Sequence, residues 1–302
     1  MRALVTGGAG SLGCRLVERL AARGAVTVLD DLSTGTRARL APLIDRGAVE
    51  LVRGDVRILS DVDAVMSGHD AVFHLAASAE HGDSDDTRLD LEVGTIATHN
   101  VLEAARRRGV PRVVLSSSAE VYGDVDGPVD EADLGALPST LRGASKLASE
   151  ALAAAFARTF AMSCVVVRAG AVVGPGRAHP TLTALDARIE AATDALLLGG
   201  DGERLAGFTH VDDWVEAALL AFDRAPAPLS ALNVAPRDLL REDALVAARL
   251  AASARPSLPV RFVPGAPPLP WPRVQLSGER LAALGFAPSR GSEEALGDAR
   301  KL

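Results

Sequence analysis

The sequence predicts an α/β protein built on a doubly wound parallel sheet, with a smaller C-terminal lobe. A glycine-rich turn at residues 7–13 lies between an apolar run and a stretch with helical spacing. Apolar runs alternate with helical stretches throughout the first half of the chain. From about residue 174, prolines interrupt the chain repeatedly, which indicates a looser second unit. Alternation of this kind is typical of a Rossmann-like sheet whose two faces are both covered by helices.

Seven short apolar runs are predicted to form strands. They span residues 2–5, 25–29, 49–52, 71–75, 113–115, 164–167 and 231–234. The last run lies in the proline-rich half of the chain, and we expect it to return to the main sheet. Helices are expected at residues 89–108, 143–160, 213–223 and 242–252. In a doubly wound sheet, ligands bind outside the carboxyl ends of the strands.

Composition excludes several classes of protein. The chain has 302 residues, 48% of them hydrophobic, and a formal net charge of -7. Non-specific nucleic-acid binding needs a basic surface, so we expect no nucleic-acid partner. No apolar run reaches the length of a membrane span, and the first strand leaves no room for a signal peptide, so we expect a cytoplasmic protein. The cysteines and histidines form no closely spaced cluster, so no metal site is predicted.

The glycine-rich turn predicts a dinucleotide site. Gly7, Gly10 and Gly13 follow the first apolar run and precede a stretch whose leucines recur on one helical face. Such a turn lets backbone N–H groups and a helix N-terminus meet a pyrophosphate without an intervening side chain. Asp30 ends the second apolar run, where an acid meets the hydroxyls of the adenosine ribose and repels a 2′-phosphate. The predicted cofactor is therefore NAD; the alternative, that Asp30 only caps a strand, is disfavoured by the glycine turn.

Two lobes follow from this pattern. The dinucleotide-binding lobe is expected at residues 1–173, rejoined by about 208–235. Residues 174–207 and 236–302 are expected to form a substrate lobe. No linker is long enough to separate independent domains.

A series of short motifs runs along nearly the whole chain. They lie at residues 7–13, 29–35, 54–57, 74–77, 116–123, 143–146, 172–175 and 210–213. Their content and order resemble the extended short-chain dehydrogenases/reductases, and more narrowly the NAD-dependent nucleotide-sugar epimerase/dehydratase group. The resemblance implies a Rossmann-like fold, an NAD cofactor and a small-molecule substrate.

The resemblance also assigns cofactor contacts by position. It implies that the pyrophosphate is held by Gly7, Gly10, Ser11, Leu12 and Gly13. It places around the adenosine ribose Asp30, Asp31, Ser33, Thr34 and Gly35. It assigns the adenine to Asp55 and Val56, the nicotinamide half to Leu75, Ala76 and Ala77, and the nicotinamide ribose to Lys146.

The catalytic positions depart from the family pattern. In the family, catalysis rests on a tyrosine four residues before a lysine, on one helical face, and on a serine or threonine that ends the fifth strand. Lys146 matches the lysine and Ser118 the serine, but Arg142 stands where the tyrosine is expected. A phenolate can take a proton from a substrate hydroxyl, whereas a guanidinium stays protonated and can only donate hydrogen bonds or hold an anion. The chain's single tyrosine, Tyr122, falls where the family keeps a structural tyrosine.

Other side chains are weaker candidates for the missing base. Glu120 lies two residues after Ser118, where related dehydratases and decarboxylases use an acid. A solvated or helix-capping role for Glu120 is equally open. His81 and His179 are further candidates because an imidazole titrates near neutrality, although a surface-loop role is more common for such residues.

Further departures fall on the substrate side of the site. Gly94 and Ala171 stand where the family commonly has asparagine. Residues 206–207 replace an Arg-Asp pair whose arginine often contacts a nucleotide diphosphate, and Arg204 is a candidate to compensate. Because the cofactor positions are kept, we interpret these losses as a changed substrate or a changed chemistry.

Three functions remain open at this point. The leading hypothesis is an NAD-dependent epimerase/dehydratase-type oxidoreductase that reduces a ketone or epimerises a sugar or sugar-like biosynthetic intermediate. Its expected catalytic residues are Ser118, Glu120, Arg142 and Lys146. The alternatives are a lyase, isomerase or cyclase that keeps NAD as a structural element, and a catalytically silent dinucleotide sensor. A homodimer is expected through the helices at 89–108 and 143–160, as in many family members.

Overall fold

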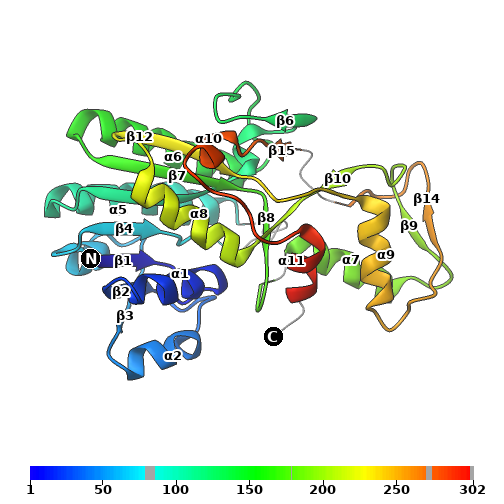
Figure 1. Ribbon diagram of the computed structural model, residues 1–302, viewed down its shortest axis with the longest axis horizontal. Helices are drawn as coiled ribbons and strands as arrows, with labels where there is room; N and C mark the ends of the chain where they lie inside the picture. Colours follow the sequence, from blue (N-terminus) through cyan, green and yellow to red (C-terminus); the bar gives the residue numbers. More distant parts are fainter. Residues whose placement is uncertain (79–85, 178, 270–273, 300–302) are drawn as a thin grey trace.

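A seven-stranded parallel sheet forms the centre of the molecule (Figure 1). The computed structural model describes residues 1–78, 86–177, 179–269 and 274–299. In spatial order the strands are β12 (Leu229–Val234), β7 (Ser163–Ala169), β5 (Arg112–Ser118), β4 (Ala71–His74), β1 (Arg2–Thr6), β2 (Ala25–Asp30) and β3 (Val49–Arg53). Because the order reverses direction between β1 and β4, the sheet is doubly wound, and the predicted fold class is confirmed.

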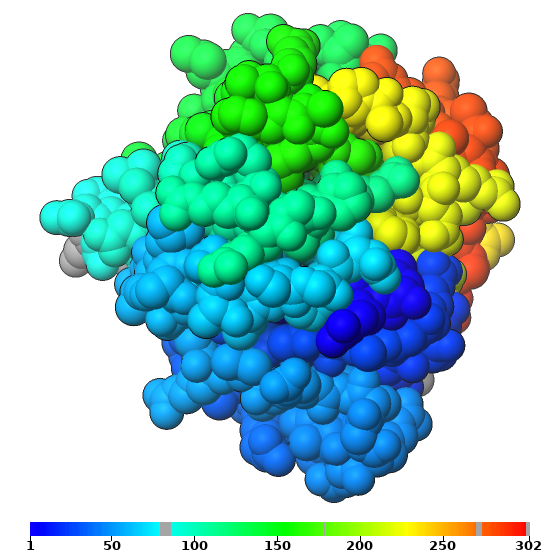
Figure 2. Space-filling model, turned by 90° about the vertical axis from the view of Figure 1, so that its left-hand side faces the viewer, coloured from blue at the N-terminus to red at the C-terminus, as the bar shows by residue number. Residues whose placement is uncertain are grey.

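Helices cover both faces of the sheet because its strands are apolar on both sides. One face is covered by α1 (Ser11–Ala21), α2 (Arg37–Asp45) and α8 (Val211–Arg224). The other is covered by α3 (Leu59–Met66), α5 (Ala97–Arg108) and α6 (Leu141–Phe160). Figure 2 views the sheet end of the molecule, with the yellow segment of α8 on one side and the green segment of α6 toward the other. No helix within the described ranges combines the length and the apolarity needed to cross a bilayer.

The helix predicted over residues 89–108 differs in its first half. It comprises α4 (Thr87–Asp90), a π-helical stretch over Leu91–Ile96, and then α5. Side chains bond the carbonyl groups of the widened stretch: Ser145 Oγ donates to Asp90 O (2.6 Å), and Thr98 Oγ1 donates to Gly94 O (2.6 Å). A side chain at residue 94 would collide with the Ser145 hydroxyl, so Gly94 permits the close approach of α6.

The remaining elements form a smaller lobe beyond the carboxyl ends of the strands (Figure 1). Its helices are α7 (Pro180–Ala191), α9 (Glu242–Ala251) and α11 (Ser292–Asp298). Its short strands pair as β8 (Ala171–Val173) with β11 (Phe208–His210), β9 (Leu196–Leu198) with β14 (Val260–Phe262), and β10 (Leu205–Ala206) with β13 (Leu240–Arg241). Leu182, Leu185, Leu245 and Leu296 are buried together in its core. The exact division of the chain into two lobes stays a prediction.

Three small elements lie beside the last strand of the sheet (Figure 1). β6 (Gly127–Val129) pairs with β15 (Val274–Leu276), and α10 (Glu279–Ala283) follows β15. β12 itself pairs in parallel with β7 over its whole length, from Leu229 to Val234. The strand expected at residues 231–234 therefore does return to the main sheet.

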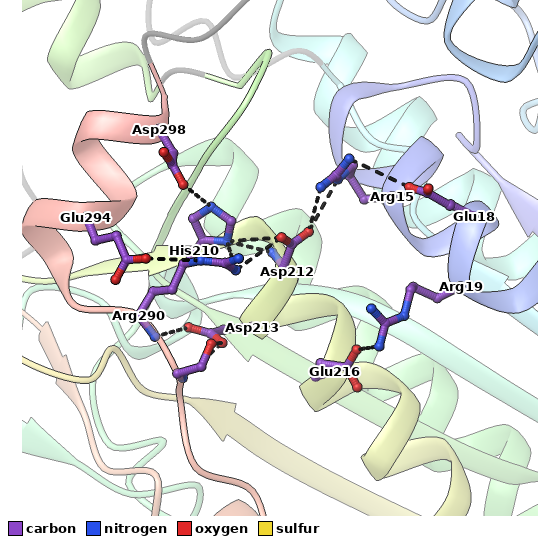
Figure 3. A network of polar contacts seen from close by, with 11 residues as sticks. Arg15, Glu18, Arg19, His210, Asp212, Asp213, Glu216, Arg290, Glu294 and Asp298 are labelled. Carbon is purple, nitrogen blue, oxygen red and sulfur yellow. Dashed lines mark hydrogen bonds and ion pairs between the residues drawn. The ribbon is translucent and has the colours of Figure 1, made fainter.

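A polar network at the N-terminus of α8 joins α1 to the C-terminal segment (Figure 3). Asp213 is buried and accepts hydrogen bonds from the N–H groups of Ser289 and Arg290 (3.0 Å each) and from the Ser289 hydroxyl (2.6 Å). The neighbouring Asp212 pairs with Arg15 of α1 and with Arg290 (3.1 Å each). Two adjacent carboxylates thus fasten three segments that are distant in the sequence.

His74, at the end of β4, is buried as a neutral imidazole between two threonines. Its Nδ1 is bonded to the Thr6 hydroxyl (2.6 Å) and its Nε2 to the Thr98 hydroxyl (3.2 Å). Burial, with a smaller contribution from the charge of Lys146, lowers the pKa of His74 to about 3. The folded protein therefore excludes a proton that the unfolded chain would bind in mild acid.

Replacing His74 should make the unfolding free energy less sensitive to a fall in pH below 7. An exposed histidine has a pKa of about 6.5, so the stabilisation is complete above that pH and is lost as the pH falls toward 3. Between pH 7 and pH 5, the wild type should lose about 2 kcal/mol more unfolding free energy than a His74→Asn variant. Urea denaturation at both pH values measures the difference. Equal acid sensitivity of the two proteins would contradict this account.

Candidate active site

The glycine-rich turn between β1 and α1 leaves its backbone open to a ligand. Gly7 has a φ of +71°, and a Cβ at this position would lie 2.7 Å from the Ala76 nitrogen, while one at Gly13 would collide with the Gly7 carbonyl oxygen. Gly10 caps α1 without a side-chain hydrogen bond, and the first turn of α1 holds no acidic residue. Helix N–H groups without such a cap suit an anion. The turn therefore fits the pyrophosphate of NAD. The individual contacts stay a prediction for Gly7, Gly10, Ser11, Leu12 and Gly13.

The acidic residue at the end of β2 lies directly against this turn. Asp30 accepts hydrogen bonds from the N–H groups of Ala9 and Leu32 (2.9 Å each), which fix the orientation of its carboxylate. The Thr36 N–H donates to the Ala9 carbonyl (3.0 Å), so the segment after β2 is held beside the turn. The residues predicted to surround the ribose thus share one edge of the sheet with the glycines: Asp30, Asp31, Ser33, Thr34 and Gly35.

The next two strand ends extend this edge. After β3, both carboxylate oxygens of Asp55 accept hydrogen bonds from Arg57 Nε (3.0 and 2.9 Å), and this hydrogen bonding lowers the pKa of Asp55. After β4, the Leu75 N–H donates to the Thr6 carbonyl (3.1 Å), which keeps the chain alongside β1. The structure therefore places at neighbouring strand ends Asp55, Val56, Leu75, Ala76 and Ala77. Their contacts with a cofactor stay a prediction.

The four predicted catalytic residues meet at the carboxyl end of β5. Ser118 is the last residue of β5, and its Oγ accepts from the Glu120 N–H (3.2 Å) and donates to Glu120 Oε1 (3.4 Å). Lys146 lies on α6, and its Nζ donates to the Ser116 carbonyl (2.8 Å). Arg142 lies one turn before Lys146 on the same helix.

Arg142 forms an ion pair with Glu120 across the gap between α6 and β5. Its Nη1 donates to Glu120 Oε1, and both side chains are about a quarter exposed. The other oxygen of Glu120 accepts from the Thr140 hydroxyl (2.6 Å). Thr140 also caps α6, because its Oγ1 accepts from the Gly143 N–H (3.0 Å). Glu120 is therefore held within a hydrogen-bonded group that also contains Ser118, Thr140 and Arg142.

Ser118, Glu120 and Arg142 line a pocket between the sheet and the second lobe. The pocket is lined by Leu12, Ser116, Ser117, Ser118, Ala119, Glu120, Arg142, Ala169, Gly170, Val172, Arg177, His179 and Trp214. The sequence analysis missed Thr140, Arg177 and Trp214. A hydroxyl residue just before a helix is an N-cap signal that could have found Thr140. No pattern in the sequence marked Arg177 or Trp214.

Tyr122 belongs to a buried structural network. Its hydroxyl donates to Asn233 Oδ1 (2.6 Å) and accepts from Arg168 Nη1 (2.8 Å). Arg168 in turn forms a buried ion pair with Glu150 (2.6 Å). Burial raises the pKa of Tyr122 above its ordinary value, which makes proton loss harder. The structural role predicted for Tyr122 is confirmed.

The candidate histidines differ in what the structure shows of them. His179 caps α7, because its Nδ1 accepts from the Thr181 N–H (3.3 Å), and it also lines the pocket. His81 lies outside the described residues. His210 caps α8 through an Nδ1 that accepts from the Asp212 N–H (3.0 Å), in keeping with a structural role.

The departure at residue 207 has a packing explanation. A side chain at Gly207 would collide with Pro236 and would lie 2.8 Å from Leu239, so the aspartate of the family pattern has no room here. Arg204 Nη1 donates to the Leu269 carbonyl (3.3 Å), within the second lobe. Arg204 is not among the residues that line the pocket described above.

Comparison with known proteins identifies the family. A family model described as the NAD dependent epimerase/dehydratase family matches residues 3–235. The chain belongs to this family. The match includes every strand of the sheet and all the residues of the site described above. The predictions of family, fold and NAD as the cofactor of the family are confirmed.

The relatives include proteins named as dehydratases and proteins named as epimerases. A dTDP-glucose 4,6-dehydratase from Streptomyces niveus is 34% identical over 239 residues, which cover 73% of this chain and 68% of that protein. A UDP-glucose 4-epimerase from Mycolicibacterium smegmatis is 34% identical over 243 residues, or 76% and 74% of the two chains. The solved structure of a Thermus thermophilus UDP-glucose 4-epimerase in complex with NAD is 30% identical, with a TM-score of 0.82 over 99% of this chain and 97% of that one.

A Tyr122→Phe variant should separate structure from chemistry. Removing the hydroxyl takes one hydrogen bond from each of two buried side chains, Asn233 and Arg168. The unfolding free energy should therefore fall by about 1–3 kcal/mol. The dissociation constant for NAD should stay unchanged, because Tyr122 lies outside the predicted cofactor residues. Urea denaturation and isothermal titration calorimetry measure the two quantities. Unaltered stability together with weakened NAD binding would show the role to be something else.

Proposed function

We propose that this protein is an NAD-dependent oxidoreductase that reduces a keto group, or epimerises a carbinol centre, of a sugar or sugar-like biosynthetic intermediate. One observation carries the proposal: Ser118, Glu120 and Arg142 line one pocket with Leu12 of the glycine turn. Lys146 is hydrogen-bonded to Ser116, which also lines this pocket. A polar pocket that adjoins a dinucleotide edge suits a reaction between the cofactor and a small polar molecule. The sugar nucleotides in the names of the relatives support a sugar-like substrate.

NAD, when bound, supplies or accepts a hydride. The glycine turn would hold its pyrophosphate, and the strand ends after β2, β3 and β4 would hold the adenosine and nicotinamide halves. Lys146 would donate hydrogen bonds to the nicotinamide ribose. Its ammonium is already directed to the end of β5 by the Ser116 carbonyl.

Ser118 would hold the reacting oxygen of the substrate. Its hydroxyl lines the pocket, and its bond to Glu120 Oε1 is long at 3.4 Å. A substrate carbonyl at normal hydrogen-bond distance can replace this weak bond. Ser118 would then donate its proton to the developing alkoxide, and water would return a proton to the Ser118 oxygen. The Glu120 N–H, which donates to Ser118 Oγ (3.2 Å), would keep that oxygen in place.

Arg142 favours carbonyl reduction over alcohol oxidation. A guanidinium cannot accept the proton of an alcohol, but it stabilises negative charge that develops on a carbonyl oxygen. The Arg142 guanidinium is held at the pocket by its ion pair with Glu120. The other oxygen of Glu120 is held by the Thr140 hydroxyl. The site therefore combines a neutral donor, Ser118, with a permanent cation, Arg142.

Ser118→Ala should lower kcat/KM for carbonyl reduction by about 100-fold, because the donor to the reacting oxygen is lost. NADH absorbance would be followed with a panel of 4-keto sugar nucleotides and free keto sugars. The exposed Ser257→Ala serves as the matched control and should retain full activity. If no member of the panel oxidises NADH with the wild type, the redox proposal fails.

Replacing Arg142 by tyrosine separates this function from a catalytically silent sensor. If Arg142 stabilises the reacting oxygen, Arg142→Tyr should reduce ketone turnover by about 10-fold or more. UDP-glucose epimerisation is measured in parallel for both proteins. A wild type without turnover, combined with epimerisation gained by the variant, would favour the silent sensor.

The homodimer expected from the sequence is also a proposal. The helices concerned are α5 with its π-helical start, and α6. Leu91 and Ile96 in the π-helical stretch, and Phe160 at the end of α6, are exposed apolar side chains. Exposed apolar groups on both helices support association through this surface.

A further inference from the structure

We propose that Arg177, from the second lobe, binds the pyrophosphate of the dinucleotide together with the glycine turn. The inference rests on the proposed NAD site and adds to it a residue to which the sequence motifs gave no role. It would make the second lobe part of the cofactor site as well as of the substrate pocket.

A tight turn fixes the backbone of Arg177 just after β8. The Gly174 N–H donates to the Arg177 carbonyl (3.1 Å), and the Arg177 N–H donates to the Gly174 carbonyl (2.8 Å). Between them, Gly176 has a φ of +70°, a conformation that favours glycine. A side chain at Gly174 would lie only 2.5 Å from Val211 Cγ1, so α8 packs directly against this turn.

The guanidinium is anchored at one end and reaches α1 with the other. Arg177 Nε donates to the Val172 carbonyl (3.0 Å), which sets the direction of the side chain. Arg177 Nη1 then donates to the Ser11 hydroxyl (3.3 Å). Ser11 is the first residue of α1 and one of the predicted pyrophosphate ligands. An anion bound at the Ser11 end of α1 therefore lies within reach of Arg177.

The charges around Ser11 favour an anion between α1 and Arg177. A helix N-terminus carries partial positive charge, and the first turn of α1 has no acidic residue to balance it. The carboxylate that reaches α1 from α8, Asp212, is engaged with Arg15 and Arg290. Arg177 adds a full positive charge at the same end, and two positive ends repel each other until an anion bridges them. Guanidinium groups bind phosphate oxygens with two parallel hydrogen bonds, which matches a pyrophosphate.

This contact would couple the cofactor to the substrate pocket. Arg177 and His179 line the same pocket as Ser118 and Arg142. A pyrophosphate bridging α1 and Arg177 would hold that wall against the sheet. The wall of the pocket that Arg177 and His179 form would then be held more firmly when the dinucleotide is bound.

Calorimetric titration of Arg177→Gln tests the proposal without any turnover. The Kd for NAD and for ADP-ribose should rise by about 10-fold, because one charged ligand of the pyrophosphate is lost. The Kd for AMP, which has no pyrophosphate, should change by less than about twofold. Arg177→Lys keeps the charge and should lie between the two. Arg158→Gln, an exposed arginine of α6, is the matched control and should bind as the wild type does.

The outcomes separate this inference from the proposed function. An unchanged Kd for NAD in Arg177→Gln overturns the role of Arg177 while leaving the NAD site intact. An equal loss for AMP and NAD overturns it too, because damage to the turn would weaken both ligands. A wild type that binds neither NAD nor ADP-ribose would instead overturn the proposed function itself.

Discussion

The carbonyl oxygen of Gly7 occupies the space that a side chain at residue 13 would need. This single steric constraint brings the start of α1 down onto the end of β1. It aims the first-turn N–H groups at the edge of the sheet where the other strands also end. Asp30 then fastens the loop after β2 to the same turn through the Ala9 N–H, and Ala76 packs against Gly7 from the other side. The cofactor edge is therefore built outward from a place where no side chain fits.

The other half of the site depends on a pair of opposite charges. Arg142 and Glu120 neutralise each other at the rim of a partly enclosed pocket, and Thr140 keeps the carboxylate in position. Removing one member would leave its partner as an uncompensated charge, which is more costly than losing both. The position that holds a phenol in the family thus contributes a fixed charge in place of a titratable proton acceptor. In the reaction proposed above, this site would rely on hydrogen-bond donation and charge, with proton exchange left to Ser118 and solvent.

The cofactor edge could be predicted from the sequence because its residues directly follow apolar runs. Parallel strands end at one edge, so locating Asp30 and Ser118 at strand ends also placed them on the same edge of the sheet. The ion pair between Arg142 and Glu120 could not be predicted in this way. It joins side chains 22 positions apart that meet only once α6 has packed beside β5. The contact between Arg177 and Ser11 spans 166 positions and depends on a turn in the proline-rich half, where no periodic pattern exists.

The π-helical stretch before α5 shows the same limit at the level of secondary structure. Residues 91–96 carry an ordinary helical pattern, and the widening comes from hydroxyl groups on the facing helix. Gly94 is the residue in this stretch that makes room for the Ser145 hydroxyl of α6. The sequence shows that a glycine stands where the family commonly has asparagine. Only the structure shows that a side chain at this position would collide with the Ser145 hydroxyl.

The core of the second lobe is assembled from two separate stretches of chain. Leu182 and Leu185 precede the return to the sheet through β12, whereas Leu245 and Leu296 follow it. A recombination event with one crossover, placed anywhere in α8 or β12, would join half of this core to half of another. Exchange of this whole core between relatives would therefore require two coordinated junctions. Selection on this part of the molecule should act on both stretches as a matched pair.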